Sequence, residues 1–301
     1  MMDKSRYRRV MEGAADWGAY YRKNPDKFVR DYLHINLKLF QRILLVMMFS
    51  VTVAAITGAR GIGKTFISAL YCVTRAILYP GTAIILASGN RGQATLVISK
   101  IIEELEPRSA ELRAEINQRE TKVTPNLAQI VFHNGSTIKV VTAAESARGH
   151  RGHVLLIDEY RLVDKRIIDD ILRKFLTLRR MPRYELLSEE ERKREYDKEK
   201  NLTLYLTSAF FKNHWSYTKC IDTFKAMVDD RRKQFVCGFP YQLSIQEGLL
   251  DPELVADEMA ETEFSEVKWS INISVLLKPI EPGCLPGVLQ FCNANRETLS
   301  A

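Results

Sequence analysis

The sequence predicts an α/β fold in which helices flank a mostly parallel β-sheet. Short segments rich in Val, Ile and Leu alternate along the chain with longer segments whose apolar residues recur at helical spacing. A glycine-rich loop follows the first apolar strand segment, and two adjacent acidic residues end a later one. Buried strands that alternate with helices are typical of a domain built on a parallel sheet.

The pattern assigns each element in turn. Residues 1–42 are expected to be helical, with a turn and a new helix start at Asn24-Pro25. Apolar strands are expected at residues 50–56, 83–87, 154–157 and 202–206. Helices are expected at residues 64–79, 93–106 and 162–178, and Asn134-Gly135 predicts a hairpin between residues 130–133 and 137–141. The charged segment 183–200 is expected to be a solvated helix or a mobile loop.

The length and composition set the domain organisation. The chain has 301 residues, of which 46% are hydrophobic and 27% charged, and this composition excludes disorder as a class. A prior of about two domains follows from the length. We expect an N-terminal helical segment, a core, a small helical subdomain and an atypical tail, at residues 1–45, 46–210, 211–270 and 271–301.

The charge is positive and unevenly spread. The formal net charge is +7, yet residues 245–269 hold eight acidic residues and one basic residue. The rest of the chain is therefore strongly basic, which suits an anionic partner such as nucleotide or nucleic acid. A basic protein that is merely soluble explains the charge alone equally well.

Cysteines and apolar runs narrow the class of protein. The five cysteines form no C-x-x-C pair, which argues against a disulfide framework or structural zinc and fits a reducing compartment. No signal peptide is expected, because no apolar run follows the charged N-terminus. The longest near-apolar run, residues 43–56, has 14 residues and is too short to span a bilayer. No membrane partner is expected.

Residues 58–65 match the phosphate-loop pattern G-x-x-x-x-G-K-[ST] in full, between a predicted strand and a predicted helix. Glycines let successive backbone N–H groups surround phosphate oxygens, and the helix N-terminus favours the anion. Lys64 is expected to contact the β- and γ-phosphates, and the Thr65 hydroxyl to bind Mg²⁺. The residues expected to bind ATP are Gly58, Gly61, Gly63, Lys64, Thr65 and Phe66.

The apolar run Val154–Ile157 leads into Asp158 and Glu159. Side chains alternate along a strand, so the two carboxylates can take separate roles. Asp158 is expected to bind Mg²⁺, and Glu159 to orient and deprotonate the attacking water. The sequence spacing between the phosphate loop and the acidic pair leaves room for an additional strand between the two motif strands. A Glu next to the Asp favours an ATPase of this additional-strand type over a signalling GTPase. Taken alone, such a string is as often a strand end with capping acids.

Three arginines are candidates for contacting the γ-phosphate. Arg60 lies inside the phosphate loop and could act in cis, whereas Arg148 and Arg151 lie in a glycine-containing loop before the acidic strand. An arginine finger contributes about 10³ to 10⁵ in rate. The alternative for each is pairing with a local carboxylate.

Two further polar positions are candidates. Thr207-Ser208 ends a predicted strand, where a hydroxyl can sense the γ-phosphate and relay hydrolysis, or can simply form a turn. The amide of Gln41 can both donate to and accept from an adenine edge; the alternative is a surface glutamine.

Together the motifs resemble the large terminase subunit of tailed bacteriophages over about residues 15–270. The residues that carry the resemblance are Trp17, Tyr20-Tyr21-Arg22, Asn24-Pro25, Gln41, the phosphate loop with Arg60, Ser88, Gln93-Ala94, the stretch 147–159 and Leu206-Thr-Ser. The resemblance implies a P-loop NTPase of the additional-strand type, similar to RecA and terminases. It also implies an ATP-driven motor that packages double-stranded DNA.

The resemblance further implies roles and partners. Lys64 and Thr65 would bind ATP–Mg²⁺, Asp158 would bind Mg²⁺ and Glu159 would be catalytic. Arg148 or Arg151 would be donated to a neighbour in a homo-oligomeric ring, Thr207 and Ser208 would couple hydrolysis to movement, and Gln41 would contact adenine. Such motors work with a portal protein and a small terminase subunit in the bacterial host cytoplasm, encoded by a phage or prophage.

A DNA-facing surface is expected in the basic stretch 161–183, with Lys165, Arg166, Arg173 and Lys174 as its candidate contacts. Contacts to phosphates would be independent of sequence and sensitive to salt; the alternative is a solvated basic helix.

After Asp257 the chain has no aspartate, so no C-terminal nuclease is expected, and the tail suggests truncation or a frameshift. A helicase-like ATPase and a nucleotide-binding remnant without turnover remain alternatives.

Overall fold

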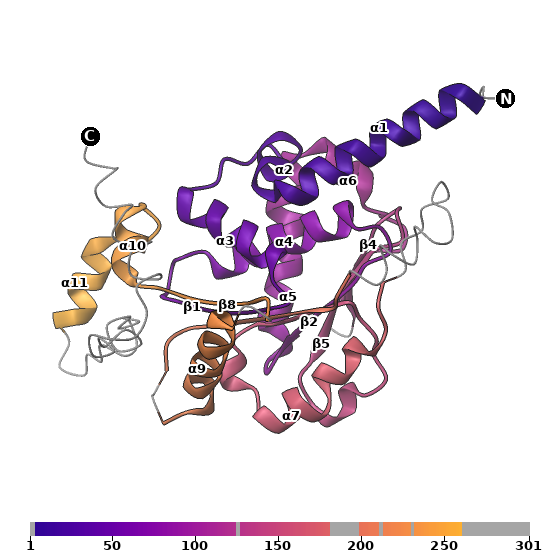
Figure 1. Ribbon diagram of the computed structural model, residues 1–301. Helices are drawn as coiled ribbons and strands as arrows, with labels where there is room; N and C mark the ends of the chain where they lie inside the picture. The colour runs from indigo at the N-terminus through magenta and orange to yellow at the C-terminus, as the bar shows by residue number, and fades with distance from the viewer. Residues whose placement is uncertain (1–3, 125–126, 181–198, 211–212, 230–231, 261–301) are drawn as a thin grey trace. The chain divides into compact units, whose positions relative to one another are not determined.

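The computed structural model describes residues 4–124, 127–180, 199–210, 213–229 and 232–260 (Figure 1). They belong to one of two units in the chain, Met1–Ile271, and the other unit is Asn272–Ala301. The tail at residues 271–301 and most of the charged segment 183–200 lie outside the described residues.

The chain begins with helices α1 (Lys4–Lys23), α2 (Pro25–Asp31) and α3 (Leu39–Ser50). Pro25 occupies the first turn of α2, where its missing N–H costs no hydrogen bond. Trp17 packs edge-on against Phe28 and Tyr32, and Phe28 is fully buried. These aromatic contacts hold the N-terminal helices together.

In the part of the chain that the structure describes, eight strands form one sheet in the order β3-β4-β5-β2-β6-β7-β1-β8. The strands are β1 (Val53–Gly58), β2 (Ala83–Ser88), β3 (Lys122–Val123), β4 (Ala128–Val131), β5 (Thr137–Thr142), β6 (Val154–Ile157), β7 (Leu202–Thr207) and β8 (Gln234–Phe239). From β5 to β8 all neighbours are parallel, whereas β3 and β4 form an antiparallel edge. The mostly parallel sheet that the sequence predicts is confirmed.

Strand β7 lies between β1 and β6 in the sheet, although it follows both of them in the sequence and does not come from the spacing between the two motifs. Thr57 of β1 pairs with Thr207 of β7, and Tyr205 of β7 pairs with Ile157 of β6. Because the strands are parallel, the phosphate loop, the acidic pair and the Thr207-Ser208 pair all follow carboxyl ends at the same edge of the sheet.

Helices cover both faces of the sheet (Figure 1). On one face lie α3, α4 (Lys64–Leu78), α5 (Arg91–Ser99), a π-helical turn (Lys100–Leu105), a 3₁₀ turn (Glu106–Arg108) and α6 (Ala110–Glu115). On the other lie α7 (Lys165–Asp170), a 3₁₀ segment (Leu172–Thr177) and α9 (Trp215–Val228). Two core clusters result, and Ile56 and Ala55 of β1 point into different ones.

Two elements differ from the prediction. The helix expected at residues 162–178 is divided into α7 and a 3₁₀ segment, because Ile171 leaves helical geometry at φ −122°, ψ −64°. Strand β8 lies within residues 211–270, which were expected to be helical, and extends the sheet beside β1. The segment also contains α10 (Tyr241–Gln246) and α11 (Pro252–Ala260).

No helix in the described ranges combines the length and apolar character needed to cross a membrane.

Candidate active site

The phosphate loop joins β1 to α4 and depends on its glycines. Gly61 and Gly63 have φ of +79° and +87°, a left-handed conformation that a side chain would strain. At Gly58 an added Cβ would lie 2.7 Å from Ile62 Cγ2 and 3.2 Å from Lys64 Cδ. The loop therefore closes on itself and leaves a channel for the Lys64 side chain.

Lys64 bonds to its own loop and to the end of β7. Its Nζ donates to the carbonyl oxygens of Gly58 (2.9 Å) and Ala59 (3.3 Å) and to Ser208 Oγ (3.2 Å). Burial lowers the pKa of Lys64, although the nearby charges of Glu159 and Asp158 oppose that shift. The ammonium thus links the loop to the strand end predicted to sense the γ-phosphate.

Asp158 follows β6 directly and is buried. Its backbone N–H donates to Ala87 O at 2.8 Å, and its Oδ1 accepts from the N–H of Glu159 at 3.0 Å. Burial and the adjacent charge of Glu159 raise the pKa of Asp158 to about 6. The site thus contains a carboxylate whose ionised form is costly without a cation beside it.

Glu159 has left-handed backbone geometry, with φ 44° and ψ 48°, which is rare for a residue with a side chain. Its Oε1 accepts from Ser208 Oγ at 2.8 Å, and its Oε2 accepts from Thr207 Oγ1 and Ser208 N, both at 3.2 Å. Two turns that are far apart in sequence therefore meet at this carboxylate.

Arg161 gives Glu159 a further donor, with its Nε 3.0 Å from Glu159 Oε2. Burial alone would raise the pKa of Glu159, but Lys64, Ser208 and Arg161 outweigh it, and the pKa is lowered. Arg161 also begins the basic stretch 161–183, in which a DNA-facing surface is expected. In the sequence, the one indication of this contact is that Arg161 lies two residues after Glu159. The left-handed turn at Glu159 cannot be predicted from the sequence.

Gln41 lies buried in the first turn of α3, beside the loop. Its Oε1 accepts from the Lys38 N–H at 3.1 Å, and a Cβ added at Gly63 would lie 3.6 Å from its Nε2. Phe66, in the first turn of α4, packs against the main core cluster. Gln41 is thus not the surface residue of the alternative interpretation.

Comparisons with known proteins show which family part of the chain resembles. Residues 55–185, which include the phosphate loop and the acidic pair, match the family model described as "Terminase large subunit, T4likevirus-type, N-terminal". This segment is similar to the N-terminal part of terminase large subunits. A comparison with curated protein sequences finds no match.

Solved terminase structures share the fold. The chain is similar to the large terminase ATPase domain of Thermus phage P74-26, with 12% identity and a TM-score of 0.56 over 82% of this chain and 97% of that one. It is also similar to the large terminase of bacteriophage HK97, with 14% identity and a TM-score of 0.50 over 72% of this chain. The match spans 43% of the HK97 chain, so this chain covers less than half of that protein's length.

The arginines predicted from the terminase resemblance do not all gather at this site. Arg60 is exposed within the loop. Arg148 is exposed and pairs with Glu145 at 2.9 Å, as its alternative interpretation expects. Arg151 precedes Gly152, where a Cβ would lie 2.8 Å from Ile85 Cγ1 near the start of β2. Arg151 is therefore close to the amino ends of the strands, away from Asp158 at the carboxyl end of β6.

The basic stretch at residues 161–183 is less uniform than expected. Lys165 and Lys174 are exposed. Arg166 lies 3.8 Å from Asp170, and Arg173 lies 3.2 Å from Asp169. Other members of the stretch are not available to a DNA surface, because Arg161 contacts Glu159 and Arg180 is buried. Arg183 lies outside the described residues.

The predicted Mg²⁺ ligands fit a hard cation chemically. Thr65 is partly exposed in the first turn of α4, and Asp158 brings a buried carboxylate to the end of β6 at the same edge of the sheet. Oxygen ligands of these kinds are those that Mg²⁺ prefers, and a cation would offset the cost of ionising Asp158.

Proposed function

We propose that the chain is the ATP-hydrolysing motor domain of a phage or prophage terminase and that it powers packaging of double-stranded DNA into procapsids. The observation that carries this proposal is the Glu159 carboxylate, which is partly buried, kept ionised and aimed by Thr207, Ser208 and Arg161 beside Lys64. A general base held in this way at the carboxyl edge of a parallel sheet suits in-line attack of water on a phosphate.

In the proposed reaction ATP binds over the phosphate loop, and the Lys64 ammonium exchanges its carbonyl partners for phosphate oxygens. Glu159 accepts a proton from the attacking water. Thr65 and Asp158 would hold Mg²⁺, which neutralises charge on the phosphates when it is bound. Gln41 lies where it could contact the adenine. Phe66 would support the nucleotide site through the packing of α4 against the main core cluster.

Coupling is proposed to run through Ser208. The Ser208 hydroxyl forms hydrogen bonds with both Lys64 and Glu159. A phosphate that draws Lys64 away would therefore change the hydrogen bonds at the end of β7. The segment after β8 also meets the loop, since a Cβ at Gly61 would lie 3.3 Å from Leu249 O. Movement of these parts would act on DNA, with Lys165 and Lys174 as exposed phosphate contacts.

The assembly is proposed from the resemblance. A homo-oligomeric ring would bring Arg148 or Arg151 of one subunit to the nucleotide of the next, while Arg60 remains a candidate in cis. The ring would bind the portal protein and the small terminase subunit in the host cytoplasm.

The test measures ATP hydrolysis with and without double-stranded DNA for the wild type, Lys64→Ala, Glu159→Gln and the control Glu120→Gln. Glu120 is an exposed carboxylate before β3, so its variant makes the same chemical change away from the site. We expect Glu159→Gln to lower kcat by about 10² to 10⁴ and the control to match wild type. Turnover that survives Glu159→Gln refutes the assignment, no wild-type turnover favours a remnant, and duplex unwinding favours a helicase.

A further inference from the structure

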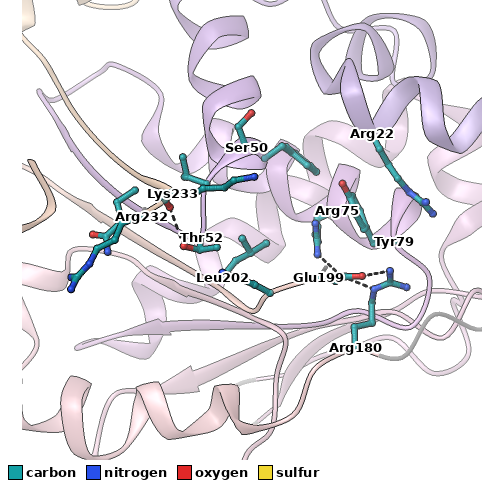
Figure 2. A pocket seen from close by; sticks show the side chains of 14 residues that line it. Arg22, Ser50, Thr52, Arg75, Tyr79, Arg180, Glu199, Leu202, Arg232 and Lys233 are labelled. Atoms are coloured by element: carbon teal, nitrogen blue, oxygen red, sulfur yellow. Dashed lines mark hydrogen bonds and ion pairs between the residues drawn. The ribbon is translucent and has the colours of Figure 1, made fainter. Parts of the chain in front are cut away.

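A cavity of about 600 Å³ lies at the edge of the sheet opposite the phosphate loop (Figure 2). Its wall includes Thr52, Leu202 and Gln234, which lie at the amino ends of β1, β7 and β8. These strands rise about 3.3 Å per residue, so the cavity lies roughly 20 Å from the nucleotide edge. It is therefore a separate site, and it does not depend on the proposed ATPase activity.

The cavity is strongly basic. Among the described residues, six cationic side chains and one carboxylate line it: Arg22, Arg75, Arg180, Lys200, Arg232, Lys233 and Glu199. Arg232 also lies 3.9 Å from Asp229, a carboxylate that does not line the cavity. The lining therefore keeps a large excess of positive charge.

Two of these cations are buried and share one carboxylate. Arg75 and Arg180 are 4% and 3% exposed, and both converge on Glu199 from different elements (Figure 2). Arg75 Nη2 donates to Glu199 Oε1 at 2.7 Å, and Arg180 Nε donates to the same oxygen at 2.8 Å. One negative charge thus serves two buried guanidinium groups, which is an unfavourable balance unless an anion completes it.

Arg75 also keeps an unused donor. Its Nε is buried without a hydrogen-bond partner among the described residues, whereas buried polar groups are normally satisfied. Its guanidinium stacks on the Tyr79 ring, with Cζ 3.5 Å from the ring centroid. The aromatic face fixes the plane of the guanidinium, so its donors are aligned before any ligand arrives.

We infer that this cavity binds a phosphate group, coordinated by the guanidinium group of Arg75 and by the exposed ammonium groups of Lys200 and Lys233. Arg180, whose nitrogens donate to Glu199 and Pro80 O, adds positive charge beside them. Planar guanidinium groups with several aligned donors match phosphate oxygens, and the exposed lysines at the rim favour entry of an anion. The phosphate belongs either to a DNA backbone or to a free ion such as inorganic phosphate or pyrophosphate.

The experiment titrates the full chain by calorimetry with pyrophosphate and, separately, with a short DNA duplex. Lys200→Gln combined with Lys233→Gln removes two exposed charges without altering the buried ion pairs. The matched control is Lys122→Gln combined with Lys225→Gln, two exposed lysines outside the cavity. Lys64→Ala separates binding at the phosphate loop, and Arg75→Gln tests the buried cluster, with circular dichroism to check its fold.

We expect the cavity double variant to bind roughly tenfold more weakly or worse, while the control double variant and Lys64→Ala retain the cavity binding. Loss of pyrophosphate affinity identifies a free phosphate as the ligand, whereas loss confined to the duplex identifies the DNA backbone. The inference is overturned if the cavity double variant binds both probes as the wild type does. It is also overturned if Lys64→Ala abolishes all pyrophosphate binding and duplex binding is equal in the two double variants.

Discussion

Replacing Asp158 with Asn should stabilise the nucleotide-free protein, although it removes a residue assigned to the site. Burial and Glu159 raise the pKa of Asp158 from 3.8 to about 6. At 1.4 kcal/mol per tenfold change, ionising this group in the folded state costs about 3 kcal/mol. Asn keeps an oxygen that can accept from the Glu159 N–H, so the substitution removes the charge and preserves the contact.

The pH dependence of this effect has a definite sign. An acid whose folded pKa is raised binds its proton more tightly in the folded state, so its ionisation destabilises the fold as pH rises from about 3.8 to about 6 and costs the full amount above that window. The advantage of Asp158→Asn should therefore be about 3 kcal/mol at pH 7.5 and about half of that at pH 5.

The assay is urea denaturation of both proteins, without nucleotide or divalent cation, at the two pH values. The control is Asp257→Asn, which changes an exposed carboxylate on α11 and should shift the unfolding free energy by less than about 0.5 kcal/mol. A variant that is no more stable than the wild type at pH 7.5, or an advantage that does not shrink at pH 5, would refute the reasoning.

Three other substitutions test the site. Arg161→Gln should lower kcat by about 10- to 100-fold with little change in KM, because it misplaces Glu159; steady-state kinetics checks this, and Arg161→Lys should restore part of the rate. Ser208→Ala should uncouple DNA stimulation from basal hydrolysis, seen as a smaller ratio of the rates with and without duplex. Gly63→Ala should weaken nucleotide binding at least tenfold, since its φ of +87° strains any side chain; calorimetry measures this, and an unchanged affinity would contradict the proposed loop geometry.

The nucleotide end of the fold could be predicted because its signals are local. The phosphate loop and the Asp158-Glu159 pair are contiguous strings that follow apolar strands, and parallel pairing then brings the strand ends to one edge. A strand is expected at residues 202–206 as well, but the spacing of the two motifs does not predict its place between β1 and β6. Gly58 and Gly63 also behave as their motif requires, since each occupies a position where a Cβ would clash or be strained.

What the sequence could not reveal depends on tertiary packing. A basic amphipathic pattern predicts a continuous helix through Arg173, yet the backbone leaves helical geometry at Ile171, which the apolar spacing does not indicate. Arg180 looks like a surface cation until Glu199, across a long segment of chain, pairs with it. The role of Arg161 depends on the left-handed turn at Glu159, and neither charge nor periodicity encodes that conformation.

The links around Ser208 explain how two distant strand ends can respond together to one ligand. Without nucleotide, Lys64 is held by two loop carbonyls and by the Ser208 hydroxyl, while Glu159 is held by Ser208 and Thr207. A phosphate competes with those carbonyls for the same ammonium, so its binding cannot leave the Ser208 contact unchanged. Since β7 extends from Ser208 back to Leu202 in the wall of the basic cavity, a shift of this strand along its axis would reach both edges of the sheet. The strand that completes the proposed catalytic arrangement thus also connects the nucleotide edge with the proposed phosphate site, as do β1 from Thr52 and α4 through Arg75.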